Sequence, residues 1–365
     1  MFGACQCGVT RSPYLVNLIV LCSVLSFCLS GYGWDATVVR STPRLHGEPG
    51  GDSHQPFAPS VQALAVTQAG VLYAGSFGMG MFRSDDQGMT WMPVNIGLTD
   101  HFFLCLAVDA QDRVYAGTVR GGVFRTKADG QQWEEIGDGL KRVEVKSFLI
   151  HSTGVFAGTG RGVYRWNEST KSWSIVAEEL DQLLVASLAM IQEKVLLAAT
   201  AGKGLFRYDV SGETASTWQG KGSELIDPKE RLHHRFLRIV ATDKRNHIFL
   251  GTQDGGIFRS TDQGNSWHTI SRTLPNDSIR SIVSHESNLY VGTGRGIYKL
   301  DSTARRWIPK NTGLADTAIQ TMIVSPDGVL YAGTSAGAFR SDNDGTQWVN
   351  ISEGLGTHTS RSGPF

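Results

Sequence analysis

Four cationic residues occur at one recurring kind of position in the sequence, just before a glycine that begins an expected strand. They are Arg120, Arg161, Lys203 and Arg295. Arginine donates paired hydrogen bonds to a carboxylate, and lysine attracts the same anion as a compact charge. The recurrence therefore predicts a basic arc that binds an anionic partner, either an acidic protein segment or an acidic glycan. The plainer alternative is that each cation only faces water.

Further residues are expected on the same surface as the basic arc. His233, His234 and Arg235 follow a long loop and would extend the positive charge. Phe77 comes from an equivalent glycine-rich segment and would add an apolar contact of the kind that anchors protein interfaces. A metal site at the two histidines is not favoured, because no other ligands accompany them in the sequence.

These positions are equivalent to one another because they belong to a repeat that runs through most of the chain. Seven similar units each contain an aromatic residue before a turn and a tryptophan after it. The first set is Phe82, Phe124, Tyr164, Phe206, Phe258, Tyr298 and Phe339, and the second is Trp91, Trp133, Trp173, Trp218, Trp267, Trp307 and Trp348. Neighbouring units lie about 40 to 50 residues apart, the length of one four-stranded propeller blade. The sequence therefore predicts an all-β fold, a single seven-bladed β-propeller with four-stranded antiparallel blades.

The order of strands in a propeller blade decides which loops share a face. Loops between the second and third strands, and the connections from one blade to the next, are expected together on one face of the ring. The basic arc and Phe77 fall in loops of this kind. Closure of the ring is expected to depend on side chains packed between the first and last blades, unless the segment before residue 61 adds a strand.

The best copy of the repeated turn covers residues 84–91 and reads SDDQGMTW. Ser84 and Asp86 can bond backbone amides, Gly88 allows a positive φ, and Trp91 opens the next strand. A second good copy contains Ser260, Asp262, Gly264 and Trp267, and the last copy keeps Ser341, Gly345 and Trp348 with Asn343 in place of the aspartate. These residues are expected to fix the turn and to have no ligand.

The combination of VLYAG, a strand such as MFRS and the turn S-x-D-x-G-x-T-W resembles the Asp-box, or BNR-repeat, propellers. The resemblance covers residues 61–356 and is closest to the photosystem II stability/assembly factor-like proteins, which are exported single propellers that act as binding platforms. Units such as GTGRGVYRW also resemble sensor propellers of two-component regulators. The motif is specific for the fold and much less so for the activity. The resemblance implies a non-catalytic platform that binds a protein client.

A glycan-binding or glycoside hydrolase propeller of the sialidase or xyloglucanase kind is the alternative. Sialidases of this group carry an Arg-Ile-Pro motif, and the nearest string here is residues 238–240, Arg-Ile-Val. Hydrolysis also needs two carboxylates at a defined separation. Asp100 and Asp316 instead recur in a Gly-Leu-x-Asp turn, which indicates a structural role. No catalytic residue is predicted.

A basic residue directly follows the strand aromatic in every unit. The set is Arg83, Arg125, Arg165, Arg207, Arg259, Lys299 and Arg340. A contact present in all seven units suits a scaffold and not a unique binding site, so these side chains are expected to pack between blades.

The chain outside the repeats divides into three segments. Residues 1–33 combine Arg11, an apolar run and small residues, which predicts a signal peptide or an uncleaved signal anchor. A lipoprotein signal at Cys28 is disfavoured by the bulky Phe27 before it. Residues 34–60 are expected to form a disordered linker and residues 357–365 a short tail. The protein is thus expected to be periplasmic or extracellular, with the leader as an optional membrane tether.

Composition excludes several other classes. The chain has 365 residues and balances 34 Lys and Arg against 34 Asp and Glu, so any charge recognition must be local. Cys105 stands alone in the repeat region and is expected to be a buried small residue. No basic and aromatic residues alternate as they would for base stacking, and export removes nucleic acid as a partner. We expect a monomer without metal or cofactor.

Overall fold

The protein is described by a computed structural model over residues 58–120, 122–176, 178–210, 219–221, 236–275, 278–301, 303 and 305–356. The chain divides into two units, Met1–Ser53 and His54–Phe365, and all described residues belong to the second. The predicted leader and the 357–365 tail lie outside the described residues. The predicted linker also lies outside them, except for residues 58–60.

The first three blades follow one another along the chain. Blade 1 contains β1 (Val61–Val66), β2 (Leu72–Ser76), β3 (Met81–Ser84) and β4 (Met92–Pro93). Blade 2 contains β5 (Phe103–Val108), β6 (Val114–Thr118), β7 (Val123–Thr126) and β8 (Trp133–Glu135). Blade 3 contains β9 (Val145–His151), β10 (Gly154–Thr159), β11 (Gly162–Asn167) and β12 (Ser172–Ile175), and the short 3-10 helix η1 (Glu178–Leu180) follows it.

The remaining four blades repeat this plan. Blade 4 contains β13 (Val185–Ile191), β14 (Val195–Thr200), β15 (Gly204–Asp209) and β16 (Gln219–Lys221). Blade 5 contains β17 (Leu237–Thr242), β18 (Ile248–Thr252), β19 (Ile257–Ser260) and β20 (His268–Thr269). Blade 6 contains β21 (Ile279–His285), β22 (Asn288–Thr293), β23 (Gly296–Leu300) and β24 (Trp307–Pro309). Blade 7 contains β25 (Ile319–Val324), β26 (Leu330–Thr334), β27 (Gly337–Ser341) and β28 (Val349–Asn350).

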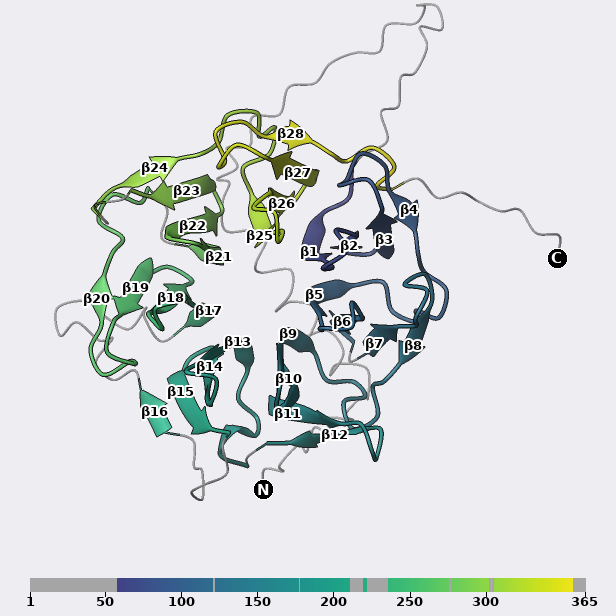
Figure 1. The fold of residues 1–365 in the computed structure, drawn as a ribbon. Coiled ribbons are helices and arrows are strands. Elements are labelled where there is room, and N and C mark those ends of the chain that lie inside the picture. Colours follow the sequence, from purple (N-terminus) through teal and green to yellow (C-terminus); the bar gives the residue numbers. More distant parts are fainter. Residues whose placement is uncertain are drawn as a thin grey trace, which may run out of the picture. The chain divides into compact units, whose positions relative to one another are not determined.

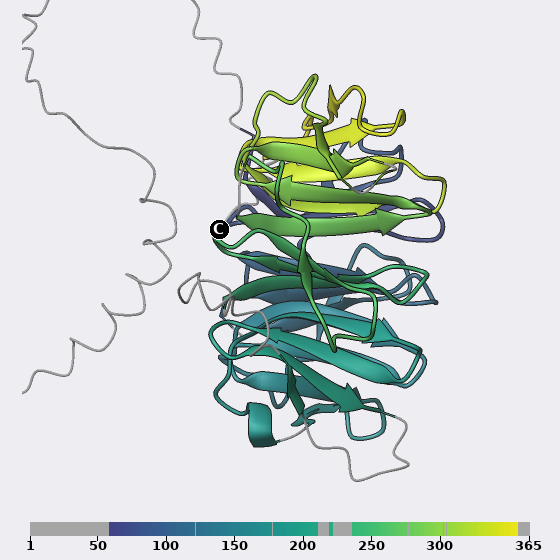
Figure 2. The same cartoon turned by 90° about the vertical axis from the view of Figure 1, so that its left-hand side faces the viewer.

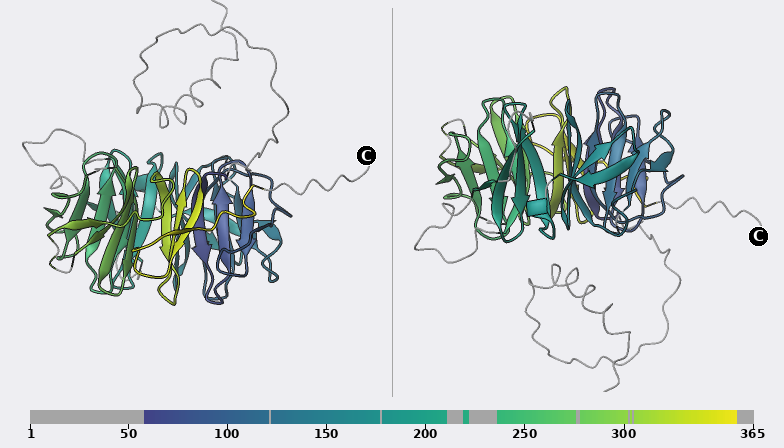
Figure 3. Two further views of the ribbon diagram at one scale, coloured as in Figure 1. Left: turned by 90° about the horizontal axis from the view of Figure 1, so that it is seen from above. Right: turned by 90° about the horizontal axis from the view of Figure 1, so that it is seen from below.

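Each blade is a four-stranded antiparallel meander, and the seven blades form a ring. Figure 1 shows the first strand of each blade nearest the axis and the fourth at the periphery. In the edge-on views of Figures 2 and 3 the strands run between the two faces of the ring. The prediction of a seven-bladed propeller with four-stranded blades is confirmed.

The second strand of each blade shows how tightly neighbouring blades pack. All five residues of β18 are buried. A Cβ added to Gly251 of this strand would lie 2.6 Å from Cγ2 of Ile239 in its own blade and 2.6 Å from Cγ2 of Ile279 in the next. Only hydrogen fits at that point, because real Cβ atoms do not approach carbon so closely. The glycine in the repeated VLYAG segment is therefore a packing requirement.

Five of the closing tryptophans tie their blade to the one before it, whereas the buried Nε1 of Trp267 in blade 5 has no partner among the described residues. Five indole Nε1 groups donate to a backbone carbonyl of the preceding blade, over 2.6 to 2.9 Å. The pairs are Trp91 with Ile351, Trp133 with Val94, Trp173 with Ile136, Trp307 with Ile270 and Trp348 with Lys310. Trp218 lies outside the described residues. The repeat thus encodes a hydrogen bond between blades as well as an apolar contact.

The serine and aspartate turns fold as their sequence indicates. Ser84 Oγ donates to Asp86 Oδ1 over 2.7 Å and accepts from the Gly88 amide over 2.8 Å. Gly88 has a φ of +91°, a conformation that favours glycine. The turn at Ser260, Asp262 and Gly264 has the same bonds at 2.7 and 2.8 Å.

The turn of blade 7 keeps this geometry although asparagine replaces aspartate. Ser341 Oγ donates to Asn343 Oδ1 over 3.0 Å, and the Gly345 amide donates to Ser341 Oγ over 3.1 Å. The amide oxygen of Asn343 therefore supplies the acceptor that a carboxylate supplies in blades 1 and 5.

Blades 1 and 7 meet without sharing a strand among the described residues. Each is complete with its own four strands, and the inner strands β1 and β25 lie in contact. Val61, Leu64 and Tyr331 belong to one apolar cluster that spans the seam. Side chains packed between the first and last blades therefore hold the ring closed, as expected from the sequence.

Four of the seven basic residues that follow the strand aromatics reach the next blade. Arg83 Nη1 donates to the Asp129 carbonyl over 2.9 Å, and Arg125 Nη1 lies 3.2 Å from Glu168 Oε2. Lys299 Nζ lies 2.5 Å from Asp344 Oδ2, and Arg340 Nη2 donates to Gln87 Oε1 over 3.0 Å. These contacts agree with the interpretation that the set holds blades together.

Candidate ligand-binding face

The turns between second and third strands and the connections between blades lie on one face of the ring, which we call the turn face. The meander order places them there, since each strand reverses direction. Direct contacts agree, because Phe77 of the β2–β3 turn forms an isolated bridge with Phe102, just before β5. The serine and aspartate turns lie on the opposite face.

Every turn between the second and third strands of a blade contains the same side-chain clasp. A serine or threonine at the end of the second strand is buried, and its hydroxyl donates to the carbonyl of the turn glycine over 2.6 to 3.2 Å. The pairs are Ser76 with Gly80, Thr118 with Gly122, Thr159 with Gly162, Thr200 with Gly204, Thr252 with Gly256, Thr293 with Gly296 and Thr334 with Gly337. The clasp fixes the backbone from which the intervening side chains project.

The basic arc lies on these clasped turns. Arg120, Arg161 and Lys203 occupy the turns of the neighbouring blades 2, 3 and 4, and Arg295 occupies the turn of blade 6. All four side chains are exposed. None forms a salt bridge with another described residue. His233, His234 and Arg235, which the sequence adds to this arc, lie outside the described residues.

Backbone hydrogen bonds anchor three of the four cations. The amides of Arg161 and Arg295 donate to the hydroxyls of Thr159 and Thr293, each over 3.0 Å. The Arg120 amide donates to Asp100 Oδ2 over 3.2 Å. Asp100 therefore binds backbone and leaves the Arg120 guanidinium to the solvent, which agrees with the structural role expected for this aspartate.

Phe77 and Arg120 converge on an aromatic residue that the sequence analysis did not single out. The rings of Phe77 and Phe102 are 5.1 Å apart and nearly perpendicular, at 77°. The Arg120 guanidinium carbon lies 5.1 Å from the centre of the Phe102 ring. Phe77 remains 39% exposed. Blades 1 and 2 thus present an amphipathic cluster of two aromatic rings and one cation.

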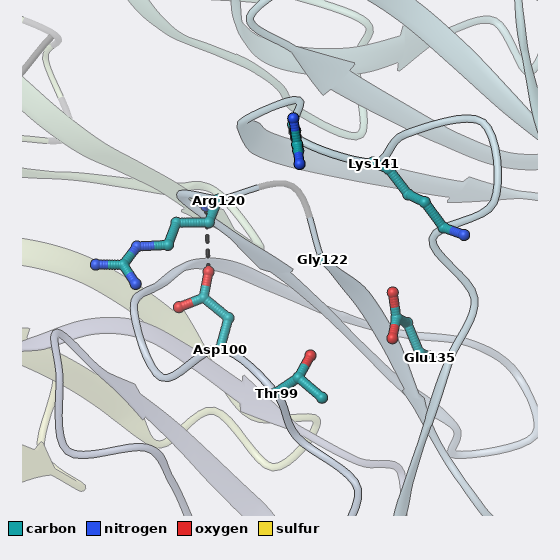
Figure 4. Close-up of a pocket in the computed structure, with 7 residues that line it drawn as sticks. Thr99, Asp100, Arg120, Gly122, Glu135 and Lys141 are labelled. Atoms are coloured by element: carbon teal, nitrogen blue, oxygen red, sulfur yellow. Dashed lines mark hydrogen bonds between the residues drawn. The ribbon is translucent and has the colours of Figure 1, made fainter. Parts of the chain in front are cut away.

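An open hollow of about 230 Å³ lies beside this cluster. It is lined by Thr99, Asp100, Arg120, Gly122, Glu135, Lys141 and Arg142. Figure 4 shows the guanidinium of Arg120 pointing away from Glu135 and Lys141. Lys141 and Arg142 lie in the connection between blades 2 and 3 and add two exposed cations to the turn face. Lys141 and Arg142 were not among the residues predicted from the sequence for this face.

The innermost strands carry a second set of residues that the sequence analysis missed. Each inner strand has a β-bulge at its second residue, where the pairing with the second strand shifts by one. The bulged residues, which we call the bulge ring, are Gln62, Leu104, Lys146, Ala186, Arg238, Arg280 and Gln320. The sequence feature that could have indicated a charged bulged residue is a cation directly after an aliphatic residue at the start of a strand, as in Leu237-Arg238.

Two guanidiniums of the bulge ring are neighbours. Burial, followed by the proximity of the positively charged Arg280, lowers the pKa of Arg238. Arg238 Nη1 donates to Ser278 Oγ over 3.1 Å, and Arg280 Nη1 donates to the Ile319 carbonyl over 3.3 Å. Like charges on these adjacent inner strands create a local positive potential.

Three other features were sought in the described part of the chain: a metal site, a reactive cysteine and a membrane-spanning helix. No group of three or more His, Cys, Asp or Glu residues there could hold a metal ion. Burial raises the pKa of the Cys105 thiol far above its usual range, so a reactive thiolate is not available. Among the described residues no helix is long and apolar enough to cross a membrane.

Neither the protein-family models nor the curated proteins give a match to this sequence. Among solved structures, the chain is similar to a protein described as the extracellular domain of a hybrid two-component system of B. thetaiotaomicron. The TM-score is 0.62 at 16% identity, and the match covers 77% of this chain and 38% of the other. This chain therefore corresponds to well under half the length of that domain.

Two single propellers are similar over most of their length. The WD40 β-propeller domain of Doa1 gives a TM-score of 0.60 at 15% identity, with 80% of this chain and 96% of the other covered. Virginiamycin B lyase from Staphylococcus aureus gives 0.61 at 13% identity, with 78% and 94% covered. At these identities the similarity establishes the propeller fold alone.

Proposed function

We propose that this protein is a non-catalytic, exported propeller that binds an acidic segment of a protein client on its turn face. The observation that carries the proposal is the basic arc. Four exposed cations sit on clasped turns of one face and have no carboxylate partner among the described residues. An acidic segment laid across the blades would supply the missing carboxylates.

The turns favour binding because their backbone is already fixed. Buried hydroxyls hold the carbonyls of Gly162 and Gly296, and the same hydroxyls accept from the amides of Arg161 and Arg295. Little backbone entropy is lost when a partner engages such a turn, and only the side chains become ordered.

The pairing of aromatic and cationic side chains favours a protein over a simple polyanion. Phe77, Phe102 and Arg120 form one contiguous cluster beside the hollow. Aromatic residues and arginine are the types that most often anchor protein interfaces. An acidic client with an apolar side chain near its carboxylates would satisfy both parts of this surface.

Further observations support export and membership of the Asp-box class of propellers. The leader-like composition of residues 1–33 supports export. The turns at Asp86 and Asp262 have the internal bonds that the Asp-box pattern implies, which supports kinship with the Asp-box propellers and an assembly-factor-like role. Similarity to the extracellular domain of a two-component system and to a WD40 domain is compatible with a binding platform.

Affinity capture tests the proposal. The full-length protein is used to isolate partners from an envelope fraction, and each partner is then titrated against purified protein. Replacement of Arg120, Arg161 and Arg295 by glutamine should weaken client binding by about a hundredfold, since each lost charge-assisted contact is worth about 1 kcal/mol or more. The affinity of the wild type should also fall steeply with added salt.

A matched variant removes the same charge from the opposite face. Lys127, Lys171 and Arg245 are exposed and lie in turns of that face in blades 2, 3 and 5. Their joint replacement by glutamine should leave client affinity within about twofold. Equal affinity of the two triple variants would reject the basic arc as the binding surface.

A glycan-binding or hydrolytic role is the second candidate, because Asp100 and Glu135 line the same hollow. Asp100 is committed to the amides of Phe102 and Arg120, which argues against a role as acid or nucleophile. Assays with chromogenic sialosides and β-glucans separate the two candidates. Turnover that Glu135→Gln abolishes would favour the hydrolase.

A further inference from the structure

Seven equivalent positions on the turn face differ in the side chains that they carry. Each is the residue directly before an inner strand, which we call the entry residue. The entry residues of blades 1 to 7 are Ser60, Phe102, Glu144, Leu184, Phe236, Ser278 and Ala318. In blades 1 to 5 and 7 the entry carbonyl accepts the first amide of the turn between the second and third strands, over 2.9 to 3.3 Å. Because serine, alanine and glutamate also occupy this position, the scaffold does not require an aromatic ring there.

Phe236 of blade 5 is the counterpart of Phe102 in blade 2. Phe236 forms an isolated bridge with Ala201 of the turn in blade 4, just as Phe102 does with Phe77 of the turn in blade 1. A Cβ added to Gly202 would lie 3.9 Å from Cε1 of Phe236, so the ring lies against that turn. Phe236 is 49% exposed and Phe77 is 39% exposed. The turn face thus presents half-exposed aromatic rings at two seams between blades, and such rings often anchor protein interfaces.

The two aromatic seams flank the part of the basic arc that occupies neighbouring blades. Blades 2, 3 and 4 carry Arg120, Arg161 and Lys203. In Figure 1 the inner strands β5, β9, β13 and β17 follow one another around the axis, and Phe102 precedes β5 while Phe236 precedes β17. Three cations therefore have an aromatic contact at each end of the row.

Charge is not even along this sector of the turn face. The connection between blades 2 and 3 adds two cations to the Arg120 end of the sector, Lys141 and Arg142. Exposed acids occur toward the other end, at Asp181 in the connection between blades 3 and 4 and at Asp254 in the turn of blade 5. Electrostatic attraction of an acidic segment is therefore strongest near blade 2. Near blade 5, an apolar contact is the stronger attraction that the surface offers.

We propose that the client segment carries an apolar side chain on each side of its acidic residues, one packed on Phe77 and Phe102 and the other on Phe236. The inference rests on the proposed function, because the acidic residues between these two anchors are those that the basic arc binds. A polypeptide fits this surface, since it can place single apolar groups at both ends of a charged stretch, whereas an acidic glycan repeats its carboxylates without them. Two apolar anchors at a fixed separation also distinguish the client from other acidic chains.

A short extended segment can reach both anchors. The anchors are three blades apart in the ring, and sheets packed face to face are spaced about 10 Å apart, so the path along the turns is about 30 Å. An extended chain advances about 3.3 Å per residue, and about ten residues therefore span this distance.

Selection of displayed random peptides against the full-length protein tests the pattern without knowledge of the client. A library of peptides of about 20 residues is long enough to cross the sector in extended form. Enriched sequences should contain acidic residues with an apolar residue on each side, the two apolar residues being about ten positions apart. Peptides selected in parallel on Phe236→Ser should keep the acidic residues and lose the second apolar position.

Fluorescence anisotropy of one enriched peptide gives the size of each contact. Phe77→Ser and Phe236→Ser should each weaken binding about tenfold, because the apolar side chain of the peptide loses part of its burial. Phe236→Leu keeps an apolar side chain and should weaken binding by less than about threefold. Val349→Ser removes a residue that is 58% exposed on the outer strand β28 and should leave binding within about twofold. Melting temperatures verify that each variant is folded.

Double-mutant cycles assign each apolar residue of the peptide to its ring. Serine at one apolar position of the peptide should be non-additive with Phe77→Ser, and serine at the other should be non-additive with Phe236→Ser, because residues in contact are coupled. The crossed combinations should be additive. Additivity in all four combinations would show that the rings do not contact the peptide and would overturn the proposal.

The triple variant of Arg120, Arg161 and Arg295 separates this inference from the proposed function. Acidic peptides that lose affinity for the triple variant but not for Phe236→Ser would overturn the second anchor and leave the basic arc in place. Peptides that lose affinity for Phe236→Ser but not for the triple variant would reject the basic arc and, with it, the proposed pattern. A selection that enriches no acidic peptide would count against both.

Competition with oligogalacturonate tests the glycan alternative on the same surface. The proposal expects this acidic glycan to displace the peptide only weakly and with no dependence on Phe236. Strong displacement that Phe236→Ser reduces would assign the two aromatic seams to an acidic glycan and overturn the proposal.

Discussion

The indole of Trp91 donates a hydrogen bond to the carbonyl of Ile351 over 2.6 Å, which joins the first blade of the ring to the last. The two residues are 260 positions apart in the sequence, and both are buried. The same bond joins blades 1 and 2 through Trp133 and Val94 over 2.8 Å. Ring closure therefore uses the interaction that holds an ordinary pair of blades.

Replacement of Trp91 by phenylalanine should lower the free energy of unfolding by about 2 to 4 kcal/mol. It removes the N–H and part of the ring, and it leaves a buried carbonyl without its donor. Urea denaturation measures the change, with the exposed Met92→Leu as control. Trp133→Phe should cost a similar amount, and a far smaller loss for Trp91→Phe would mean that another contact closes the ring.

Gly251→Ala should destabilise the protein by about 1 to 3 kcal/mol, because the added methyl would overlap Ile239 and Ile279. Blade 4 offers a comparison, since Ala199 occupies the equivalent position on β14 and is fully buried. Ala199→Gly should lose about 1 kcal/mol or more through backbone entropy and lost contact. Thermal melting of both variants would reveal whether the position must be small in every blade. A neutral Gly251→Ala would contradict the packing argument.

The turns with aspartate should make stability depend on pH in the acid range. Hydrogen bonds from the Ser266 side chain and then its amide lower the pKa of Asp262, and bonds from Thr90 lower that of Asp86. A depressed native pKa means that the stabilisation is present above the ordinary carboxyl pKa, about 4, and is lost as pH falls below it. Melting temperatures between pH 6 and 3 should therefore decrease less for Asp262→Asn than for wild type.

The asparagine at position 343 provides the internal control for that prediction. Asn343 Oδ1 accepts from the Gln347 amide over 2.9 Å, and an amide does not titrate in this range. Asn343→Asp should add acid sensitivity to blade 7. An unchanged pH profile in both variants would show that these turns do not control the acid transition.

Much of the fold was predictable because the same residue types recur at the same positions in each unit and favour the same local structure. The recurring tryptophan and the strand-two glycine have the same role in most blades, as Trp91 and Gly251 show. The threonine clasp was not recognised. Its signal is a hydroxyl residue three or four positions before the turn glycine, as in Thr159 and Gly162.

The candidate site was only partly predictable. Position in the repeat sufficed for the Arg120 and Arg161 turns, because turn residues are set by local sequence. The contribution of Phe102 to the site depends on its contact with the ring of Phe77 in blade 1, and the sequence does not indicate that contact. Arg238 and Arg280 were missed because a bulge is a property of the pairing between two strands, and a cation after an aliphatic residue at a strand start indicates it only indirectly.

The clasp should matter for binding as well as for stability. Thr293→Val removes the donor to the Gly296 carbonyl over 2.9 Å and the acceptor for the Arg295 amide over 3.0 Å. The variant should lose about 1 to 3 kcal/mol of stability, and client affinity should fall severalfold because Arg295 leaves its fixed turn. Thr252→Val changes the clasp of blade 5, whose turn carries no member of the basic arc, and should affect stability alone. Equal affinity losses would argue against preorganisation.

Phe102 and Arg120 should contribute to client binding in different ways. Phe102→Leu removes the ring on which Phe77 and the Arg120 guanidinium rest but leaves the charge. Client affinity should fall about threefold to tenfold while its dependence on salt remains, because the lost energy is aromatic contact. Arg120→Gln should lower both affinity and the slope of that dependence, since screening acts on the charge. Titrations at two salt concentrations separate the effects, and identical slopes for both variants would show that Arg120 acts through its contact with the ring and not through its charge.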